Sequence, residues 1–220
     1  MTKIKICGIT NREDALLAAN LGVDALGFVF AESPRQVSPE EAREIISHLP
    51  PLLVKAGVFV NESLSRILEI VDFCQLNLVQ LSGDEDDQFC LKLNRPYVKV
   101  FKVFDARILK LIKTHPSPYF ILDTYEKGKG GGTGKTFYWE IAKMAVNVGR
   151  VILAGGLTPE NLYEALEEVK PYGVDVSSGV EERPRKKDRS KLFQFVETVR
   201  VWDREMDILA SMEGGSFQKH

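Results

Sequence analysis

The 220-residue sequence lacks the features that mark several common classes of protein. Its three cysteines, Cys7, Cys74 and Cys90, are odd in number, widely spaced and without a CxxC pair, so neither a disulfide framework nor a zinc knuckle is indicated. No apolar run reaches the ~18 residues that span a bilayer, and the first residues lack the apolar region of a secretory signal. We therefore expect a cytoplasmic protein without a membrane partner.

An excess of charge of one sign is also missing. Lys and Arg number 29 and Asp and Glu number 31, so the formal net charge is −2 and no general basic field is available to attract a nucleic-acid backbone. Histidine is scarce too. The three histidines, His48, His115 and His220, fall at predicted helix, loop and tail positions and form no set of metal ligands. We expect neither a nucleic-acid partner nor a bound metal.

What the sequence does contain is a regular alternation of short apolar runs and longer stretches with helical spacing. One helical stripe comprises Ala42, Ile45, Ile46 and Leu49, and similar stripes start at Leu64 and Leu162. Capping residues precede predicted helices at Thr10-Asn11, Ser38-Pro39 and Thr158-Pro159. The apolar runs predict eight strands: Lys3–Gly8, Ala25–Phe30, Leu53–Phe59, Leu76–Leu81, Val98–Val103, Tyr119–Asp123, Arg150–Ala154 and Gly173–Ser177.

The chain length alone does not predict the fold class. The number of βα units and the composition of the strands do. The runs Leu26–Phe30 and Val151–Ala154 are almost continuously apolar, as in parallel strands that are buried on both faces. Eight βα units in ~200–250 residues fit a single α/β domain, a (β/α)8 TIM barrel, better than a doubly wound open sheet. We expect the barrel to span residues 1–201, with a short helical extension over 202–220 that ends in a mobile Gly214-Gly215-Ser216 segment.

In such a barrel the active site lies at the carboxyl ends of the strands, where this sequence is polar or rich in glycine. Paired glycines or a Ser-Gly pair after the seventh and eighth strands are typical of a phosphate site built from backbone N–H groups, although ordinary turns also use glycine. The candidate site residues are Cys7, Arg35, Gln80, Asp123, Gly155, Gly156, Asp175, Ser178 and Gly179.

Two of these candidates have simpler explanations that must be weighed. A free cysteine such as Cys7 is most often a small buried hydrophobe, but its place at a strand end before Gly8 favours a functional role. Asp123 could cap a helix or form a salt bridge. Because a Gly-rich loop, Lys127–Lys135, follows it without a prompt helix, the capping explanation is weak.

The Gly-rich loop superficially resembles a nucleotide-binding P-loop. The motif G-x-x-x-x-G-K-[ST] requires a glycine five residues before Gly134, and Lys129 stands there. We therefore reject nucleotide binding and interpret the loop as a flexible active-site loop or lid.

Seven motifs, each at or just after a predicted strand end, carry a resemblance to a known family. The segment from Lys3 to about Val199 resembles the phosphoribosylanthranilate isomerases, through the motifs Lys5–Thr10, Gly27–Phe30 with Ser33–Arg35, Val79–Leu81 with Gly83–Glu85, Leu122-Asp123, Gly131–Gly134, Leu153–Leu157 and Gly173–Glu181. The family often has His where Ser82 stands, and Gly where Arg185 follows Pro184. The resemblance therefore does not predict which substrate contacts those two loops make.

The resemblance implies a reaction of tryptophan biosynthesis without cofactor or metal. This is the Amadori rearrangement of N-(5′-phosphoribosyl)anthranilate to 1-(2-carboxyphenylamino)-1-deoxyribulose 5-phosphate, so the expected partner is a small phosphosugar. The family roles fall on Cys7 as general base, Asp123 as general acid and Arg35 on the anthranilate side of the substrate. Gln80 and Asp175 occupy motif positions that face the barrel mouth and are expected substrate contacts.

The residue types suit this chemistry independently of the resemblance. A protonated carboxyl can open a furanose ring and a thiolate can then remove the C2 proton, although reference pKa values of ~3.9 and ~8.5 mean that both groups must be tuned. Three alternatives remain at this point: an indole-glycerol-phosphate synthase, a ribulose-phosphate epimerase and a catalytically silent phosphosugar-binding barrel. The sequence offers no convincing Lys and Glu set for the first or His set for the second, and a binder needs no Cys7 and Asp123 pair.

Overall fold

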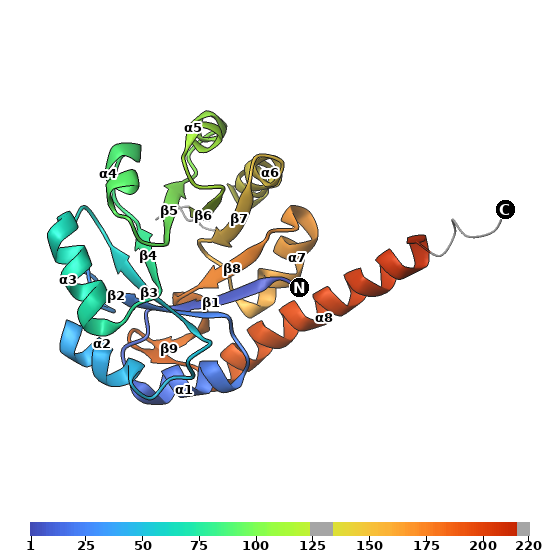
Figure 1. Ribbon diagram of the computed structural model, residues 1–220. Coiled ribbons are helices and arrows are strands. Elements are labelled where there is room, and N and C mark those ends of the chain that lie inside the picture. The colour runs from blue at the N-terminus through green and yellow to red at the C-terminus, as the bar shows by residue number, and fades with distance from the viewer. Residues whose placement is uncertain (124–133, 215–220) are drawn as a thin grey trace.

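The computed structural model describes residues 1–123 and 134–214 of the chain, and within these residues eight parallel strands close into a barrel (Figure 1). Each strand pairs with the next, and the eighth pairs with the first, where Lys3 to Ile6 lie beside Gly173 to Val176. The (β/α)8 fold predicted from the sequence is confirmed. The strands are β1 Lys3–Cys7, β2 Ala25–Val29, β3 Val54–Phe59, β4 Leu78–Leu81, β5 Tyr97–Lys102, β6 Tyr119–Asp123, β7 Arg150–Ala154 and β8 Gly173–Val176.

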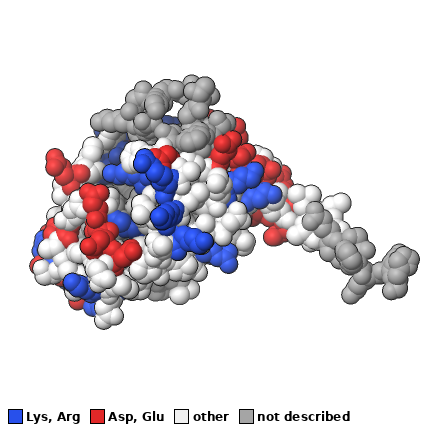
Figure 2. Space-filling view, turned by 90° about the horizontal axis from the view of Figure 1, so that it is seen from above, with Lys and Arg blue, Asp and Glu red and all other residues white. Residues whose placement is uncertain are grey.

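A ring of helices covers the outside of the barrel (Figure 1). Helix α8 is by far the longest, and its red C-terminal half projects away from the barrel body in that view. The helices are α1 Arg12–Asn20, α2 Pro39–Ile46, α3 Leu64–Cys74, α4 Asp87–Lys92, α5 Ile108–Thr114, α6 Gly134–Val146, α7 Pro159–Val169 and α8 Arg189–Gly214. On the face shown in Figure 2, many of the lysine and arginine side chains gather toward the middle, and acidic side chains lie mainly to either side of them.

The predicted capping residues begin the helices that they were expected to begin. Asn11 accepts a hydrogen bond from the backbone N–H of Asp14 at 2.9 Å and starts α1. Ser38 and Glu41 exchange hydrogen bonds between side chain and backbone at the start of α2, with Pro39 in the first turn. Thr158 is the capping residue of α7. These local signals fix where each helix enters the outer ring.

The buried apolar side chains form two separate layers. The larger one joins the outward face of the strands to the helices and contains the predicted stripes of α2, α3 and α7. The smaller one packs inside the barrel and comprises Leu78, Val98, Val100, Ile121, Ile152 and Ala154. The barrel interior is therefore a packed core below its mouth, as this fold requires.

Several boundaries differ from the sequence prediction for local reasons. Strand β4 begins at Leu78 instead of Leu76, and helix α4 begins at Asp87, where Asp86 accepts a 2.7 Å hydrogen bond from the N–H of Phe89 and acts as the cap. Of the predicted Gly-rich loop, Gly134 and Lys135 are the first residues of α6, and the segment before them lies outside the described residues.

An additional element follows β8, where no structure was predicted. A short 3-10 turn, Ser178–Val180, leads into a two-stranded antiparallel hairpin of β9 Glu181–Arg183 and β10 Lys186–Lys187. The hairpin lies between β8 and α8 in the chain, so residues from both of its strands are available to the barrel mouth.

Helix α8 continues without interruption across residues 201 and 202, where we expected the barrel to end and the extension to begin. Gly214, the first residue of the predicted mobile segment, is the last residue of α8, and the rest of that segment lies outside the described residues. Over residues 1–123 and 134–214, no helix is both long enough and apolar enough to cross a membrane.

A buried carboxylate joins the N-terminal strand to α8 and gives a test of this packing. Asp203 accepts hydrogen bonds from the backbone N–H of Thr2 at 2.8 Å and from the Thr2 hydroxyl at 2.8 Å. Asp203→Ala leaves both donors buried without their acceptor, so we expect the free energy of unfolding to fall by about 1–3 kcal/mol in urea titrations. Asp207→Ala, at an exposed position of the same helix, is the control. Equal stability of the two variants would contradict the role of Asp203.

Candidate active site

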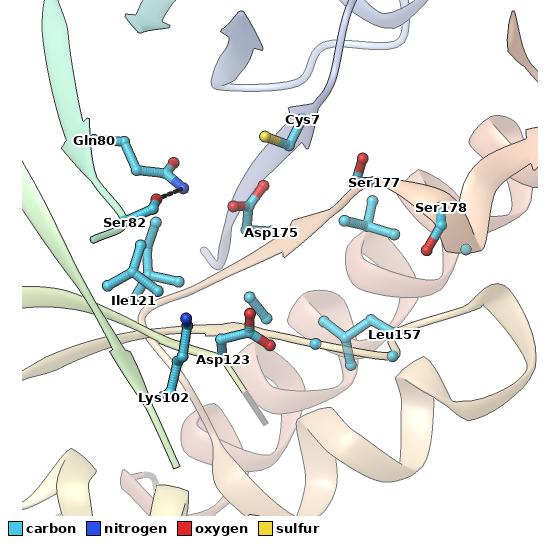
Figure 3. A pocket seen from close by; sticks show the side chains of 16 residues that line it. Cys7, Gln80, Ser82, Lys102, Ile121, Asp123, Leu157, Asp175, Ser177 and Ser178 are labelled. Carbon is cyan, nitrogen blue, oxygen red and sulfur yellow. Dashed lines mark hydrogen bonds between the residues drawn. The ribbon is translucent and has the colours of Figure 1, made fainter. Parts of the chain in front are cut away.

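A cavity of about 370 Å³ opens at the carboxyl ends of the strands. Figure 3 shows Asp175 between Cys7 on one side and Asp123 on the other, with Gln80 and Ser82 on a third side. Its wall includes all of the sequence-predicted site residues except Arg35: Cys7, Gln80, Asp123, Gly155, Gly156, Asp175, Ser178 and Gly179. The volume is within the ~300–1,000 Å³ range of small-molecule sites.

The period of the strands explains why polar side chains meet at this level. Side chains two residues apart point to the same face of a strand, so Gln80 and Asp123 stand directly above Leu78 and Ile121 of the inner core. In the same way Cys7 stands above Lys5 on β1. The floor of the cavity is therefore apolar, lined by Val100, Ile121 and Ala154, and its upper wall is polar.

A buried ion pair lies beneath Cys7. The ammonium of Lys5 contacts Asp175 Oδ2 at 2.7 Å, and both side chains are only 7% exposed. Burial raises the pKa of the Cys7 thiol, and Asp175 acts in the same direction, while the nearby charges of Lys5 and Lys187 lower it. The net result is a pKa above the ordinary value of a cysteine.

A second buried charge network ties the strand ends together above this pair. The ammonium of Lys187 donates to the carbonyl oxygens of Cys7 at 2.7 Å and Ser177 at 3.0 Å, and to Glu181 Oε1 at 3.2 Å. Glu181 also accepts two hydrogen bonds from Arg35, at 2.8 and 2.6 Å. Burial would raise the pKa of Glu181, but Arg35 and Lys187 outweigh it and hold that pKa below its usual value.

Arg35 therefore points toward Glu181 in this structure and does not line the cavity. Its aliphatic stem crosses Gly8, where a Cβ would overlap the Arg35 side chain and stand 2.9 Å from Ser177 Oγ. Gly8 also has a φ of +74°, a conformation that side chains disfavour. The glycine that follows Cys7 thus allows Arg35 to reach the edge of the site.

The loops after β7 and β8 meet without room for a side chain. A Cβ on Gly179 would overlap the carbonyl oxygen of Leu157, and Gly155 and Gly156 have φ values of +85° and +68°. Asn161 donates to the carbonyl oxygen of Gly156 at 2.9 Å and accepts from the N–H of Thr158 at 2.8 Å. These contacts fix the orientation of the peptides that line this side of the cavity.

Two buried oxygen atoms in the cavity wall have no hydrogen-bond partner among the described residues. They are Gln80 Oε1 and Asp175 Oδ1. Gln80 donates instead to Ser82 Oγ at 3.2 Å, which fixes its amide across the mouth (Figure 3). Buried acceptors of this kind are costly unless a donor reaches them, so the cavity is suited to a ligand with hydroxyl groups.

Comparison with known proteins identifies the family. The model of the N-(5′-phosphoribosyl)anthranilate (PRA) isomerase family matches residues 4–198. The chain belongs to this family. The isomerase of Pelobacter propionicus is 50% identical over 197 residues, which cover 89% of this chain and 94% of that protein.

Solved structures of the family agree in fold. The phosphoribosylanthranilate isomerase of Thermotoga maritima is 41% identical with a TM-score of 0.84, and the alignment covers 91% of this chain and 99% of that one. A phosphoribosylanthranilate isomerase in complex with reduced 1-(o-carboxyphenylamino)-1-deoxyribulose 5-phosphate is 38% identical with a TM-score of 0.82, over 91% of this chain and 99% of that one. The resemblance found in the sequence is thereby confirmed.

The two departures from the isomerase pattern have structural consequences. Ser82 lines the cavity and holds Gln80 by its hydroxyl. Arg185 adopts a φ of +74° where the isomerase pattern leads us to expect glycine, and it keeps the turn by donating to the carbonyl of Gln36 at 2.7 Å. Its own carbonyl accepts from Thr10 at 2.7 Å. This chain thus replaces a flexible residue with one that bridges two loops.

Several charged groups that support the site were not predicted from the sequence. Lys102, at the end of β5, lies in the cavity wall, and the register pairs it with Asp123. Lys5, Lys187 and Glu181 are buried beside or below the cavity. A usable signal existed for Lys5, because a lysine two residues before Cys7 on a buried parallel strand must face the barrel interior. For Lys187 and Glu181 there was no such signal, since the hairpin that contains them was not predicted.

The network of Glu181 gives a prediction about stability and pH. Glu181→Gln leaves the Arg35 and Lys187 charges without their carboxylate, so we expect a loss of about 3 kcal/mol in the free energy of unfolding at pH 7. Because the pKa of Glu181 is lowered in the folded state, its stabilising effect is complete above the ordinary value of 4.5 and is lost as the pH falls through the lower folded value.

Denaturant titrations of the parent and of Glu181→Gln across pH 3–7 measure this effect. The difference between them should shrink toward the acid end of the range. Glu182→Gln, at an exposed neighbouring position, is the control and should track the parent throughout. A difference that stays constant with pH would contradict the linkage.

Proposed function

We propose that general acid–base catalysis, with Asp123 as the acid and Cys7 as the base, is how this chain converts N-(5′-phosphoribosyl)anthranilate to 1-(2-carboxyphenylamino)-1-deoxyribulose 5-phosphate. The observation that carries the proposal is the placement of these two side chains in one cavity, on strands from different parts of a barrel of the isomerase family. A reducing cytoplasm as the site of action stays a prediction.

The two groups act in succession on one substrate. Asp123, protonated, donates its proton to the ring oxygen of the ribose while the bond between C1 and that oxygen breaks. This gives an iminium ion whose nitrogen carries the aryl ring. The thiolate of Cys7 then takes the C2 proton, and the electrons of that C–H bond form the C1=C2 bond and return the nitrogen to neutrality. The resulting enolamine tautomerises to the aminoketone product.

The remaining wall residues are assigned to binding. The acceptor atoms Gln80 Oε1 and Asp175 Oδ1 suit the hydroxyl groups of the ribose, since each is buried and without a donor among the described residues. Arg35 is proposed to attract the anthranilate carboxylate, because a guanidinium has donors beyond the two that Glu181 receives. Val100, Ile121 and Leu157 offer apolar surface for the aromatic ring.

The phosphate is assigned to the backbone N–H groups of Gly155, Gly156, Ser178 and Gly179. The loops after β7 and β8 are the usual phosphate-binding region of this fold. The hydrogen bond from Asn161 turns the carbonyl of Gly156 toward α7, so the other group of that peptide, the N–H of Leu157, points away from α7.

The direct test is the loss of substrate fluorescence when purified protein is added to phosphoribosylanthranilate. Asp123→Asn and Cys7→Ser should each lower kcat by about 10²–10⁴-fold, with a smaller effect on KM, because each removes a proton-transfer group. Near-parental turnover in both folded variants would refute the assignment.

Substrate deuterated at C2 separates the two roles within the same experiment. In Cys7→Ser, proton abstraction becomes slower and should limit the rate, so we expect a large isotope effect. In Asp123→Asn, ring opening becomes limiting and the isotope effect should be smaller. The reverse order would exchange the roles of the two residues.

The phosphate assignment is tested at Gly179. A methyl group there would overlap the carbonyl of Leu157 and force the two loops apart, so Gly179→Ala should raise KM by about 10-fold or more, the loss of roughly one charge-assisted hydrogen bond. Gly149→Ala is the matched control, since its Cβ would crowd the Pro118 carbonyl at 2.7 Å at the other end of the barrel. The assignment fails if both variants alter KM equally.

A further inference from the structure

Lys5 and Cys7 share the same face of β1 and approach the same point in the barrel. Gly27 on the neighbouring strand β2 faces them, and a Cβ at this position would stand 2.8 Å from Cys7 Sγ and 3.1 Å from Lys5 Nζ. The missing side chain therefore leaves space that the thiol and the ammonium occupy together. Lys5 does not line the cavity, so any effect that it has on the reaction acts through Cys7 or through its ion-pair partner Asp175.

The hydrogen-bonding capacity of the two buried lysines near Cys7 separates their roles. An ammonium has three donors, and those of Lys187 are matched by the carbonyls of Cys7 and Ser177 and by Glu181. Lys5 donates to Asp175 Oδ2 at 2.7 Å, and its ammonium lies with the Cys7 sulfur in the space beside Gly27. Lys187 thus holds the backbone at Cys7, whereas Lys5 addresses the sulfur itself.

We propose that Lys5, kept charged by Asp175, is a positioning residue that stabilises the thiolate of Cys7 and so sets the pH range in which the base works. This inference rests on the proposed function, in which the thiolate of Cys7 takes the C2 proton.

The charged groups that face the thiol act with opposite signs. Burial raises the pKa of Cys7, Lys5 and Lys187 lower it, and Asp175 raises it, while Arg35 on the loop after β2 adds a further positive charge. Burial would also lower the pKa of Lys5, but Asp175 and Cys7 outweigh this and raise it, so Lys5 stays protonated. Without the Lys5 charge, the effects of burial and Asp175 raise the pKa of Cys7 further. A smaller fraction of the thiol is then ionised at neutral pH.

The test measures the ionisation of Cys7 directly, as the rate of alkylation by iodoacetamide from pH 7 to 11, with Cys7 identified by peptide mass spectrometry. Lys5→Met should raise the midpoint of that profile by about one pH unit or more, the usual effect of one nearby charge. The kcat/KM of the same variant should fall about 10-fold or more at neutral pH and recover as the pH rises. Lys5→Arg, which keeps the charge, should stay close to the parent midpoint.

Two further variants keep the result interpretable. Lys99→Met removes a comparable buried lysine, whose ammonium lies 2.6 Å from Glu85 with side chains 7% and 3% exposed, and it should leave the alkylation midpoint of Cys7 unchanged. If Lys5→Met alone does not fold, Lys5→Met with Asp175→Asn removes the ion pair as a unit. Its midpoint should still rise, by less, because the effect of Lys5 on Cys7 exceeds that of Asp175.

The outcomes separate this inference from the proposed function. An unchanged midpoint in Lys5→Met, or an activity loss that is equal at all pH values, would overturn the role of Lys5. Parental turnover in Cys7→Ser would overturn the proposed function instead, whatever the alkylation profile of Lys5→Met. A raised midpoint together with an inactive Cys7→Ser supports both.

Discussion

The closure of the barrel between β1 and β8 is the constraint on which the rest of the site depends. The two strands pair in register, and at their carboxyl ends the ammonium of Lys187 holds the carbonyls of Cys7 and Ser177 at 2.7 and 3.0 Å. A buried charge between two strand ends replaces backbone hydrogen bonds that the ladder no longer provides there. The position of the thiol relative to Asp175 and to the Ser178 loop therefore depends on one side chain from the hairpin after β8.

The sequence predicted the parts of this arrangement that depend on local pattern. Strand length, helical stripes and capping residues repeat along the chain. This repeated pattern predicted the barrel and placed Cys7, Asp123 and Gly179 at or just after strand ends. The hairpin of β9 and β10 did not, because its strands are only three and two residues long and carry no apolar alternation. Glu181 lies on that hairpin and engages Arg35 from a distant loop, a contact that no local pattern encodes.

The buried charges beneath the site serve its geometry more than its stability. Each ion pair must first offset the loss of hydration of both partners, so an apolar pair of similar volume would often be at least as stable. What a charged pair adds is direction, since Lys5 and Asp175 must lie where their hydrogen bonds are satisfied. One oxygen of Asp175 faces Lys5 and the other is left in the cavity wall without a partner among the described residues. A single carboxylate thus links the support of the base to the proposed recognition of the ribose.

The charges around Cys7 are fixed by burial and hydrogen bonding, and this follows the chemistry assigned to the thiol. Around Cys7, Lys5, Asp175 and Lys187 are buried and joined by short hydrogen bonds, so the environment of the thiolate exists before a substrate arrives. Such preorganisation is what makes fixed charges effective in a dry site. On the other side Asp123 is half-buried and Lys102 is exposed. Cys7 and Asp123 are both partly exposed in the cavity wall, so the acid can take up a proton again after each turnover and the thiol can return its proton to the enolamine.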